Sequence, residues 1–365
     1  MKNYLAKVAK CIAIFIIILL AFQEIGFSAA QQSDKSHIRG VKAKVIDIVS
    51  EEKDYQLVEL VITEGNFINK KVRAEFHSTF EFYGITLKEN DYVLLSLTFD
   101  QNNNFQKATI TNIVREKYML YLFAGYALLL FIIGGFKGLR AILSLIFSYF
   151  IIIKVLFPLI VKGYEPIYIT ILICSGITVI SLILIGGFNK KTVSAILGTL
   201  FGLIVAAMIA IEVGGLSHIT GVVDDEFYLL GFLPLKSSFS YQGLLFSGII
   251  IGSLGAVMDV SMSIASAINE LTEHSYNMSP LKLIAAGMNV GKDAIGTMTN
   301  TLILAYMGGS IYMMLVLTAE NATLAELINS EAIATEILRS MAGSIGIILT
   351  VPFTAAISGL LIRRK

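Results

Sequence analysis

The residues best able to do chemistry are isolated polar and ionisable side chains within long apolar runs. Asp259 stands near the middle of the apolar run 243–271, and Ser263, Ser266 and Asn269 follow it. Steps of three and four residues place Asp259, Ser263 and Ser266 on one face of a helix. An ionised carboxylate at the centre of a bilayer costs roughly 3 kcal/mol on insertion scales, so it usually binds an ion, relays a proton or forms a buried pair. For the serines alone, hydrogen bonding between helices is the simpler interpretation.

A second group of polar residues occupies the stretch 281–300. Asn289, Asp293 and Asn300 recur at helical spacing and share a face. Lys292 is adjacent to Asp293, so it points in another direction and must find water, lipid headgroups or a carboxylate on another helix. The candidate pathway residues in this stretch are Asn289, Lys292, Asp293, Thr297 and Asn300.

Glycine at positions 287, 291 and 296 interrupts the same stretch. Ser279 and Pro280 before it form a helix-start signal, with serine as the N-cap and proline at the first position. Glycine-interrupted helices beside charged residues are typical of the broken helices of transporters, which offer free backbone groups to ions. The analogy suggests a broken helix here, and we place the membrane span at about 294–317.

The last apolar run, 333–361, supplies partners for these charges. Glu336 and Arg339 are three residues apart, and Arg339 lies several residues inside the run. Arg339 can pair with Glu336, or with Asp259 or Asp293 on another helix, and each pair would lower the cost of burying charge. Such a pair can serve transport or only hold helices together, and the sequence leaves both interpretations open.

The composition identifies the elements that carry these residues as membrane helices. Hydrophobic residues make up 55% of the 365-residue chain and charged residues only 15%, and the mean hydropathy is +0.75. A soluble domain has about 25% charged residues. The net charge of +1 gives no support for a nucleic-acid partner. We therefore expect an α-helical transmembrane bundle.

Seven apolar runs that follow residue 117 are long enough to span a bilayer. They lie at about 118–136, 141–161, 166–187, 193–213, 243–271, 294–317 and 333–361. With the N-terminus inside, Lys and Arg concentrate in the inner loops and Asp and Glu in the outer ones. This predicts a bundle of seven spans, or eight with the N-terminal segment, and a C-terminus on the inner side.

The N-terminal part divides into two regions. Residues 1–30 have the layout of a secretory signal peptide or an uncleaved anchor helix, because three lysines precede a short apolar core and a small-residue stretch. In both cases residues 31–117 are exported, and residues 118–365 form the bundle.

Residues 31–117 are predicted to form a small β domain. Five runs of strand-like composition, separated by turn signals rich in Gly and Asn, begin near Val41, Leu57, Lys71, Asp91 and Ala108. Five short strands in this length indicate an extracytoplasmic β-barrel that is OB-like. Because the domain is exported and charge-balanced, a structural, partner-docking or gating module is favoured over a nucleic-acid binder.

The sequence contains no enzyme signature among those we considered. There is no HExxH and no GxSxG, and the stretch from Gly287 to Asp293 lacks the spacing and the hydroxyl of a P-loop. Neither Cys11 nor Cys174 has metal-ligand spacing. We therefore expect no enzymatic activity, no metal and no cofactor.

Three long stretches of the bundle are distinctive. They are GAVMDVSMSIAS at 255–266, GKDAIGTMTNTLILA at 291–305 and EILRSMAGSIG at 336–346. They resemble the YibE/YibF-like family of bacterial membrane proteins, and the resemblance covers nearly the whole chain. It implies a place in the bacterial cytoplasmic membrane, and it implies no catalytic residues.

These observations favour a small-solute or ion transporter. Asp259 or Asp293 would bind a cation or relay a proton, and the outer β domain would gate or recruit. The alternative is a non-transporting membrane scaffold or assembly factor whose β domain recruits partners, with the charges as structural pairs. The expected surroundings are the lipid bilayer, a small solute or cation, and a second copy or another membrane protein, without nucleic acid.

Overall fold

A computed structural model describes most of the chain beyond the N-terminal region. The described residues are 37–52, 55–65, 67–77, 85–99, 105–222, 240–274, 278–320 and 322–362. The predicted signal peptide or anchor at 1–30 lies outside the described residues. The chain forms two compact units, one up to Leu129 and one from Leu130 onward.

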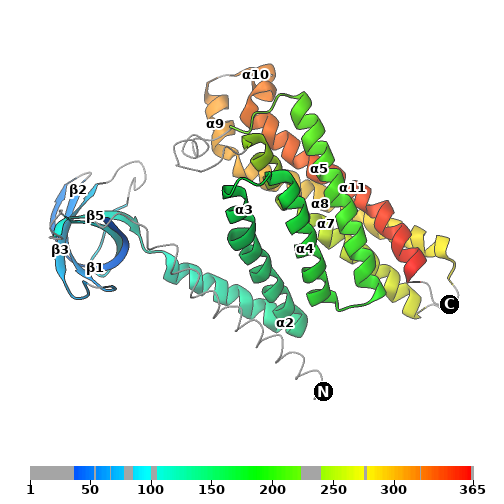
Figure 1. Cartoon of the computed structure of the whole chain (residues 1–365), viewed down its shortest axis with the longest axis horizontal. Helices are drawn as coiled ribbons and strands as arrows, with labels where there is room; N and C mark the ends of the chain where they lie inside the picture. Colours follow the sequence, from blue (N-terminus) through cyan, green and yellow to red (C-terminus); the bar gives the residue numbers. More distant parts are fainter. Residues whose placement is uncertain are drawn as a thin grey trace, which may run out of the picture. The chain divides into compact units, whose positions relative to one another are not determined.

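The first unit contains a closed five-stranded β-barrel (Figure 1). Its strands are β1 (His37–Glu52), β2 (Tyr55–Ile62), β3 (Lys71–His77), β4 (Tyr92–Phe99) and β5 (Phe105–Ile113). Neighbours around the barrel follow the order β1-β2-β3-β5-β4, and every pair is antiparallel except β3 with β5, which is parallel. The five predicted strands and the barrel are confirmed.

Alternating burial along the strands fills the barrel. In β2, Val58, Leu60 and Ile62 are buried, and the residues between them are half-buried, as expected for a strand with one face toward a core. The buried amide of Gln56 is satisfied on both sides. Its Nε2 donates to the carbonyl of Leu87 at 3.3 Å, and its Oε1 accepts from the Leu87 N–H at 2.7 Å. These two bonds fix the segment before β4 to the barrel.

Helices make up most of the described chain after the barrel. They are α2 (Glu116–Ile151), the π-helix η2 (Ile152–Leu156), α3 (Phe157–Val161), α4 (Pro166–Gly186), α5 (Lys190–Leu216), α7 (Tyr241–His274), α8 (Pro280–Gly309), α9 (Ile311–Ala319), α10 (Leu324–Asn329) and α11 (Glu331–Leu361). Within the described residues, five helical runs are long and apolar enough to cross a membrane, or six if α8 and α9 form one bent span.

The first run joins two of the predicted spans. We expected spans at 118–136 and 141–161 with a short loop between them, but α2, η2 and α3 form one helical run from Glu116 to Val161. The run is interrupted at Gly135, whose φ of 54° and ψ of −134° lie outside the helical region. Glycine adopts this conformation without the clash that a Cβ would cause. The change of direction expected of a loop is therefore made at a kink.

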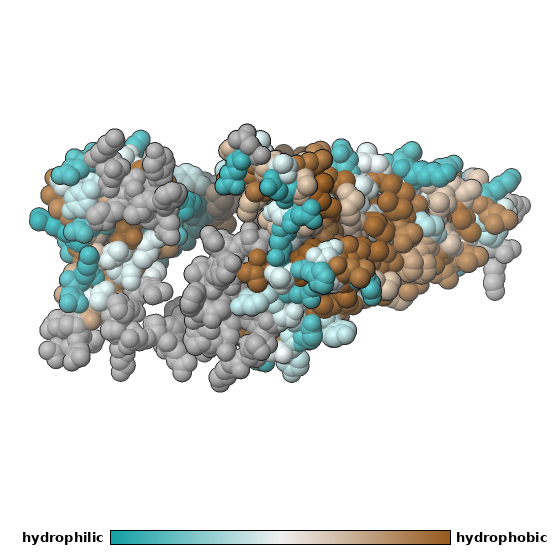
Figure 2. Space-filling view, turned by 90° about the horizontal axis from the view of Figure 1, so that it is seen from above, coloured by the Kyte–Doolittle hydropathy of each residue, from teal (hydrophilic) through white to brown (hydrophobic). Residues whose placement is uncertain are grey.

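Helix α11 packs against α5, α7 and α8 (Figure 1). Small residues allow the closest approach: a Cβ at Gly202 of α5 would lie 1.8 Å from Oγ1 of Thr350 on α11. Contacts of this kind are typical of helix pairs in membranes, where lipid tails are as apolar as the side chains. Figure 2 shows apolar side chains spread over the visible surface of the bundle, as a lipid-facing surface requires.

Helix α8 does not break at its glycines. It begins at Pro280 after the N-cap Ser279, as predicted, and continues to Gly309 without a break at Gly287, Gly291 or Gly296. The broken helix that the glycines suggested is instead bent at Ser310, where α8 and α9 meet at 62°. The expected span at 294–317 therefore combines the second half of α8 with most of α9.

Candidate functional site

The polar face of α7 lies on the outside of the bundle. Val257, Val260 and Ile264 on the opposite face are buried in the core that α7 shares with α8 and α11. Asp259 and Ser263 are exposed. The shared face that the spacing predicted therefore forms, and it points away from that core.

Toward the C-terminal end of α7, the polar side chains of this face form hydrogen bonds with neighbours on the same helix. Ser266 is half-buried, and the side-chain amide of Asn269 donates to Oε1 of Glu273 at 2.8 Å, one turn further along α7. Glu270 lies 3.0 Å from Nε2 of His274 in the same way. Asp259 has no such neighbour on its own helix.

The glycines of α8 serve packing. A Cβ at Gly287 would lie 2.6 Å from Cδ1 of Ile268, and one at Gly291 would lie 2.2 Å from Cγ1 of Val351. These contacts press one side of α8 against α7 and α11. Gly296 has open space around its Cβ position, so it lies outside this contact.

The other side of α8 is polar and exposed. Asn289, Lys292, Asp293 and Asn300 are all exposed on it. The hydroxyl of Thr297 donates to the carbonyl of Ala294 at 3.1 Å, so the helix itself satisfies this side chain. The longer polar side chains cannot be satisfied in that way and extend from the helix.

These charges are not paired inside the bundle. Among the residues that the structure describes, Asp259, Lys292 and Asp293 form no ion pair. A buried structural pair was one interpretation of these residues, and the described part of the chain does not bring such a pair together. What remains is three charged side chains on outward faces of two adjacent helices.

Arg339 is held differently. Its Nη1 donates to Oε1 of Glu336 at 2.8 Å, and its guanidinium carbon lies 5.6 Å from the ring centroid of Tyr306 on α8. The hydroxyl of Tyr306 in turn covers Gly252 of α7, where a Cβ would lie 2.3 Å from it. Of the pairings that the sequence left open, the structure has Arg339 with Glu336, and not with Asp259.

A cavity of about 350 Å³ lies beside this pair. It is found at the bend between α8 and α9, and its lining includes Ser310, Tyr312, Glu336 and Arg339. Helix termini leave backbone carbonyls without helical partners, and at this bend the N–H of Ser310 donates to the carbonyls of Tyr306 and Met307. The cavity is thus lined by one ion pair and one helix end.

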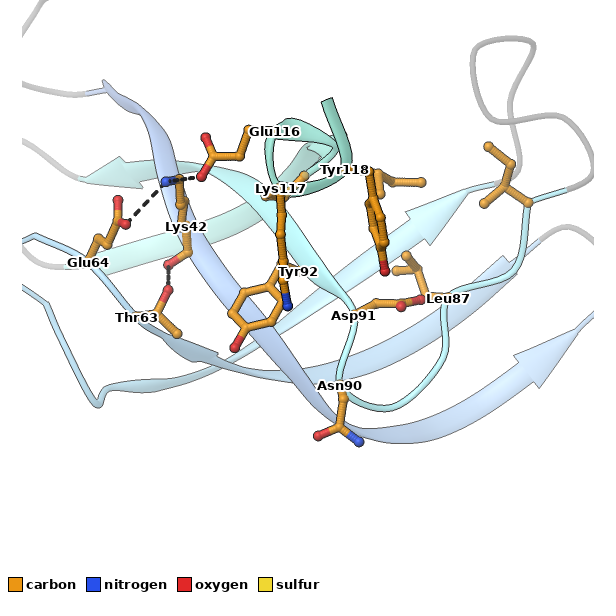
Figure 3. A pocket seen from close by; sticks show the side chains of 13 residues that line it. Lys42, Thr63, Glu64, Leu87, Asn90, Asp91, Tyr92, Glu116, Lys117 and Tyr118 are labelled. Atoms are coloured by element: carbon orange, nitrogen blue, oxygen red, sulfur yellow. Dashed lines mark hydrogen bonds and ion pairs between the residues drawn. The ribbon is translucent and has the colours of Figure 1, made fainter. Parts of the chain in front are cut away.

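The barrel has a pocket of its own, of about 520 Å³ (Figure 3). At one end Lys42 bridges two carboxylates, with Nζ 3.2 Å from Oε1 of Glu64 and 2.5 Å from Oε1 of Glu116. The hydrogen bond to Glu116, then that to Glu64, raises the pKa of Lys42 above its ordinary value. Tyr92 and Tyr118 also line the pocket.

The residues that form this pocket are not recognisable from the sequence alone. Lys42, Glu64 and Glu116 are far apart in the chain, and each looks like an ordinary surface charge in its own segment. Barrel closure and the start of α2 bring them together, and no spacing rule for a single strand or helix encodes that contact. Within the described residues, no group of three or more His, Cys, Asp or Glu side chains could hold a metal ion.

Comparison with known proteins adds one finding. A family model described as YibE/F-like protein matches residues 122–364. No curated protein and no solved structure matches the chain. The match covers the helical bundle with all the candidate residues of α7, α8 and α11, whereas the barrel lies outside it, so the resemblance is confirmed for the bundle. The chain belongs to the YibE/F-like family.

Proposed function

We propose that this protein is a permease of the bacterial cytoplasmic membrane that carries a small solute or ion along the polar faces of α7 and α8. One observation carries the proposal: Asp259, Lys292 and Asp293 are exposed within long apolar helices and form no ion pair among the described residues. Charges kept in a membrane helix for structure are expected to be paired, whereas charges on a transport path must remain available.

Asp259 is the proposed ion or proton site. It lies in the middle part of α7, and the exposed glycines at 248 and 255 leave open space on the helix surface on the N-terminal side of it. A carboxylate can bind a cation or take up a proton in such a place, and the amides of Asn289 and Asn300 on α8 would bind polar groups of a solute. We further propose that both arms of the kinked run Glu116–Val161 cross the bilayer, which restores seven spans.

The test is the variant Asp259→Asn in proteoliposomes. We expect flux to fall by at least about tenfold, because the neutral amide keeps the shape but neither binds a proton nor attracts a cation. The protein should still insert and show its normal unfolding midpoint. Ser247→Ala on the same helix, where the buried hydroxyl only donates to the carbonyl of Gly243, is the matched control and should retain flux. Wild-type flux in Asp259→Asn would refute the site assignment.

A membrane scaffold is the second candidate, and the barrel favours it. We infer that the strand order, with β3 parallel to β5, makes the barrel OB-like, and its pocket offers tyrosine rings and charged groups to a partner. A scaffold would lose partner recruitment when the pocket is altered, and it would show no flux in the wild-type protein.

A further inference from the structure

The pocket of the barrel lies at the point where the chain enters the membrane. Its lining includes Lys117 and Tyr118 from the first turn of α2, and the stretch 118–136 contains no charged residue. Tyr118 is 69% exposed, as expected of a ring at the boundary between lipid and water. Lipid headgroups occupy roughly 5–7 Å on each side of the hydrocarbon core, which is about one helical turn. All residues of the lining belong to the first compact unit, so the pocket lies at headgroup level on whichever side of the membrane the barrel is.

Two charged side chains of the lining are available to a bound molecule. Among the described residues, Lys117 and Asp91 form no ion pair. The Nζ of Lys117 lies 5.8 Å from the ring centroid of Tyr121, and Oδ2 of Asp91 accepts the N–H of Lys88 at 2.8 Å. In Figure 3, Lys117 extends from α2 into the pocket beside Tyr92, and Asp91 lies where β4 begins. Helix and barrel thus present one ammonium and one carboxylate group to the same space.

The other charges make the lining slightly negative. Lys42 forms ion pairs with both Glu64 and Glu116, so these three residues together carry one negative charge. Lys117 and Asp91 balance each other. An anion without a positive group is therefore disfavoured, whereas a zwitterion can place its anionic part at Lys117 and its cationic part near the carboxylates.

Two tyrosine rings favour an ammonium group as the cationic part. Tyr92 and Tyr118 both line the pocket, and Tyr92 is 44% exposed. The face of an aromatic ring attracts a cation, and a primary ammonium group also donates up to three hydrogen bonds, which carboxylates accept. A quaternary ammonium group has no N–H to donate, so the lining suits a primary ammonium better.

We propose that this pocket binds the headgroup of a zwitterionic phospholipid with a primary ammonium group, such as phosphatidylethanolamine. The phosphate accepts a hydrogen bond from Lys117, and the ammonium group donates to Asp91. The volume of about 520 Å³ accommodates such a headgroup, and the exposed side chains of Met119, Leu120 and Leu122 continue the surface for the acyl chains. Lipids are confined to the same level as the pocket, so their effective concentration exceeds that of a dissolved zwitterion. The bound lipid fastens the barrel to the membrane surface, with or without transport through the bundle.

Native mass spectrometry of the full-length protein in detergent tests the site. With equal amounts of phosphatidylethanolamine and phosphatidylglycerol, we expect one tightly bound lipid with about a tenfold preference for phosphatidylethanolamine. Lys117→Gln and Asp91→Asn should each reduce its binding by at least about fivefold. The amide of Asp91→Asn keeps an oxygen that can accept the Lys88 N–H, so the turn is preserved. Lys107→Gln on β5, outside the lining, is the matched control and should bind as the wild type does.

Two results would overturn the proposal. One is a wild-type protein without preference between the two lipids. The other is full binding by Asp91→Asn, because a general contact of basic residues with headgroups depends on Lys117 but not on a carboxylate of the barrel. Tyr118→Leu gives an independent variant on the exposed surface of α2, and it should also weaken binding because the ring is lost.

A soluble headgroup separates the two possible sources of the ligand. Glycerophosphoethanolamine should compete with the lipid only at a large excess, because it lacks the acyl chains. Equal affinity for the soluble compound would make the pocket a site for a dissolved zwitterion and overturn the proposal. Selective lipid binding by a protein that shows no flux would refute the permease and leave the lipid site standing.

Discussion

At the residue scale, Arg339 shows how this membrane protein holds a partly buried charge. Its guanidinium has a carboxylate from Glu336 on one side and the ring of Tyr306 on another, and the side chain remains 27% exposed. Cation–π contacts of this kind add roughly 0.5–2 kcal/mol, depending on desolvation. The contact of Arg339 with Tyr306 therefore joins α11 to α8, and Tyr306 in turn contacts α7 at Gly252.

We predict that Arg339→Met destabilises the bundle by about 1–3 kcal/mol, because Glu336 loses its ion pair in a partly buried position. The measurement is the unfolding midpoint in mild detergent. The double variant Glu336→Gln with Arg339→Met should recover most of the loss, since both charges are then removed. If the double variant is as unstable as the single one, the pair is not what stabilises this contact.

The sequence predicted which residues share a face but not where the face points. Spacing placed Asp259 with Ser263, and Asn289 with Asp293, and both groupings form. The direction depends on which side of each helix carries residues small enough for close packing. On α8 these are Gly287 and Gly291, which the sequence suggested were helix breaks and which instead pack against Ile268 and Val351. Only the neighbouring helices reveal that role.

At the element scale, α8 and its glycines can be tested separately from the polar residues. We predict that Gly291→Ala lowers stability by about 1–3 kcal/mol, because the new methyl group overlaps Val351 in a packed helix contact. Thermal unfolding in detergent measures the effect. Gly176→Ala on α4, where the Cβ position is open, is the matched control and should be neutral or slightly stabilising. Equal behaviour of the two variants would contradict the packing role.

The elements themselves were largely predictable, and the exceptions have physical causes. Strand-like composition and the turn signals between the runs located all five strands, because β-branched and other apolar residues fill the barrel core and Gly and Asn favour the turns. Hydrophobic runs located the long helices, because a helix that crosses a membrane must present apolar side chains to the lipid along its length. The kink at Gly135 and the bend at Ser310 were not predicted. Lys137 and Arg140 next to Gly135 indicated a short polar loop, whereas no charged residue marks the bend at Ser310.

At the scale of the whole molecule, the prediction concerns orientation in the membrane. The distribution of Lys and Arg predicts that the barrel lies outside and the C-terminus inside. An alkaline phosphatase reporter, which is active only outside, should be active when fused after residue 115 and inactive when fused after residue 362. Activity of the C-terminal fusion would place the C-terminus outside. Either the whole orientation would then be reversed, or the number of spans would differ from the predicted number by an odd number.

The Lys42 bridge makes the joint between the barrel and α2 sensitive to salt. The ammonium group of Lys42 forms ion pairs with Glu64, in the turn after β2, and with Glu116, in the first turn of α2. Both carboxylates are well exposed, and ion pairs between exposed groups contribute at most about 1 kcal/mol, so thermal motion opens them often. Ions screen such contacts over a distance of about 10 Å at 0.1 M salt. The contact should therefore be stronger in dilute than in concentrated salt solution, so that the ionic strength of the medium around the barrel sets how tightly α2 is held to it.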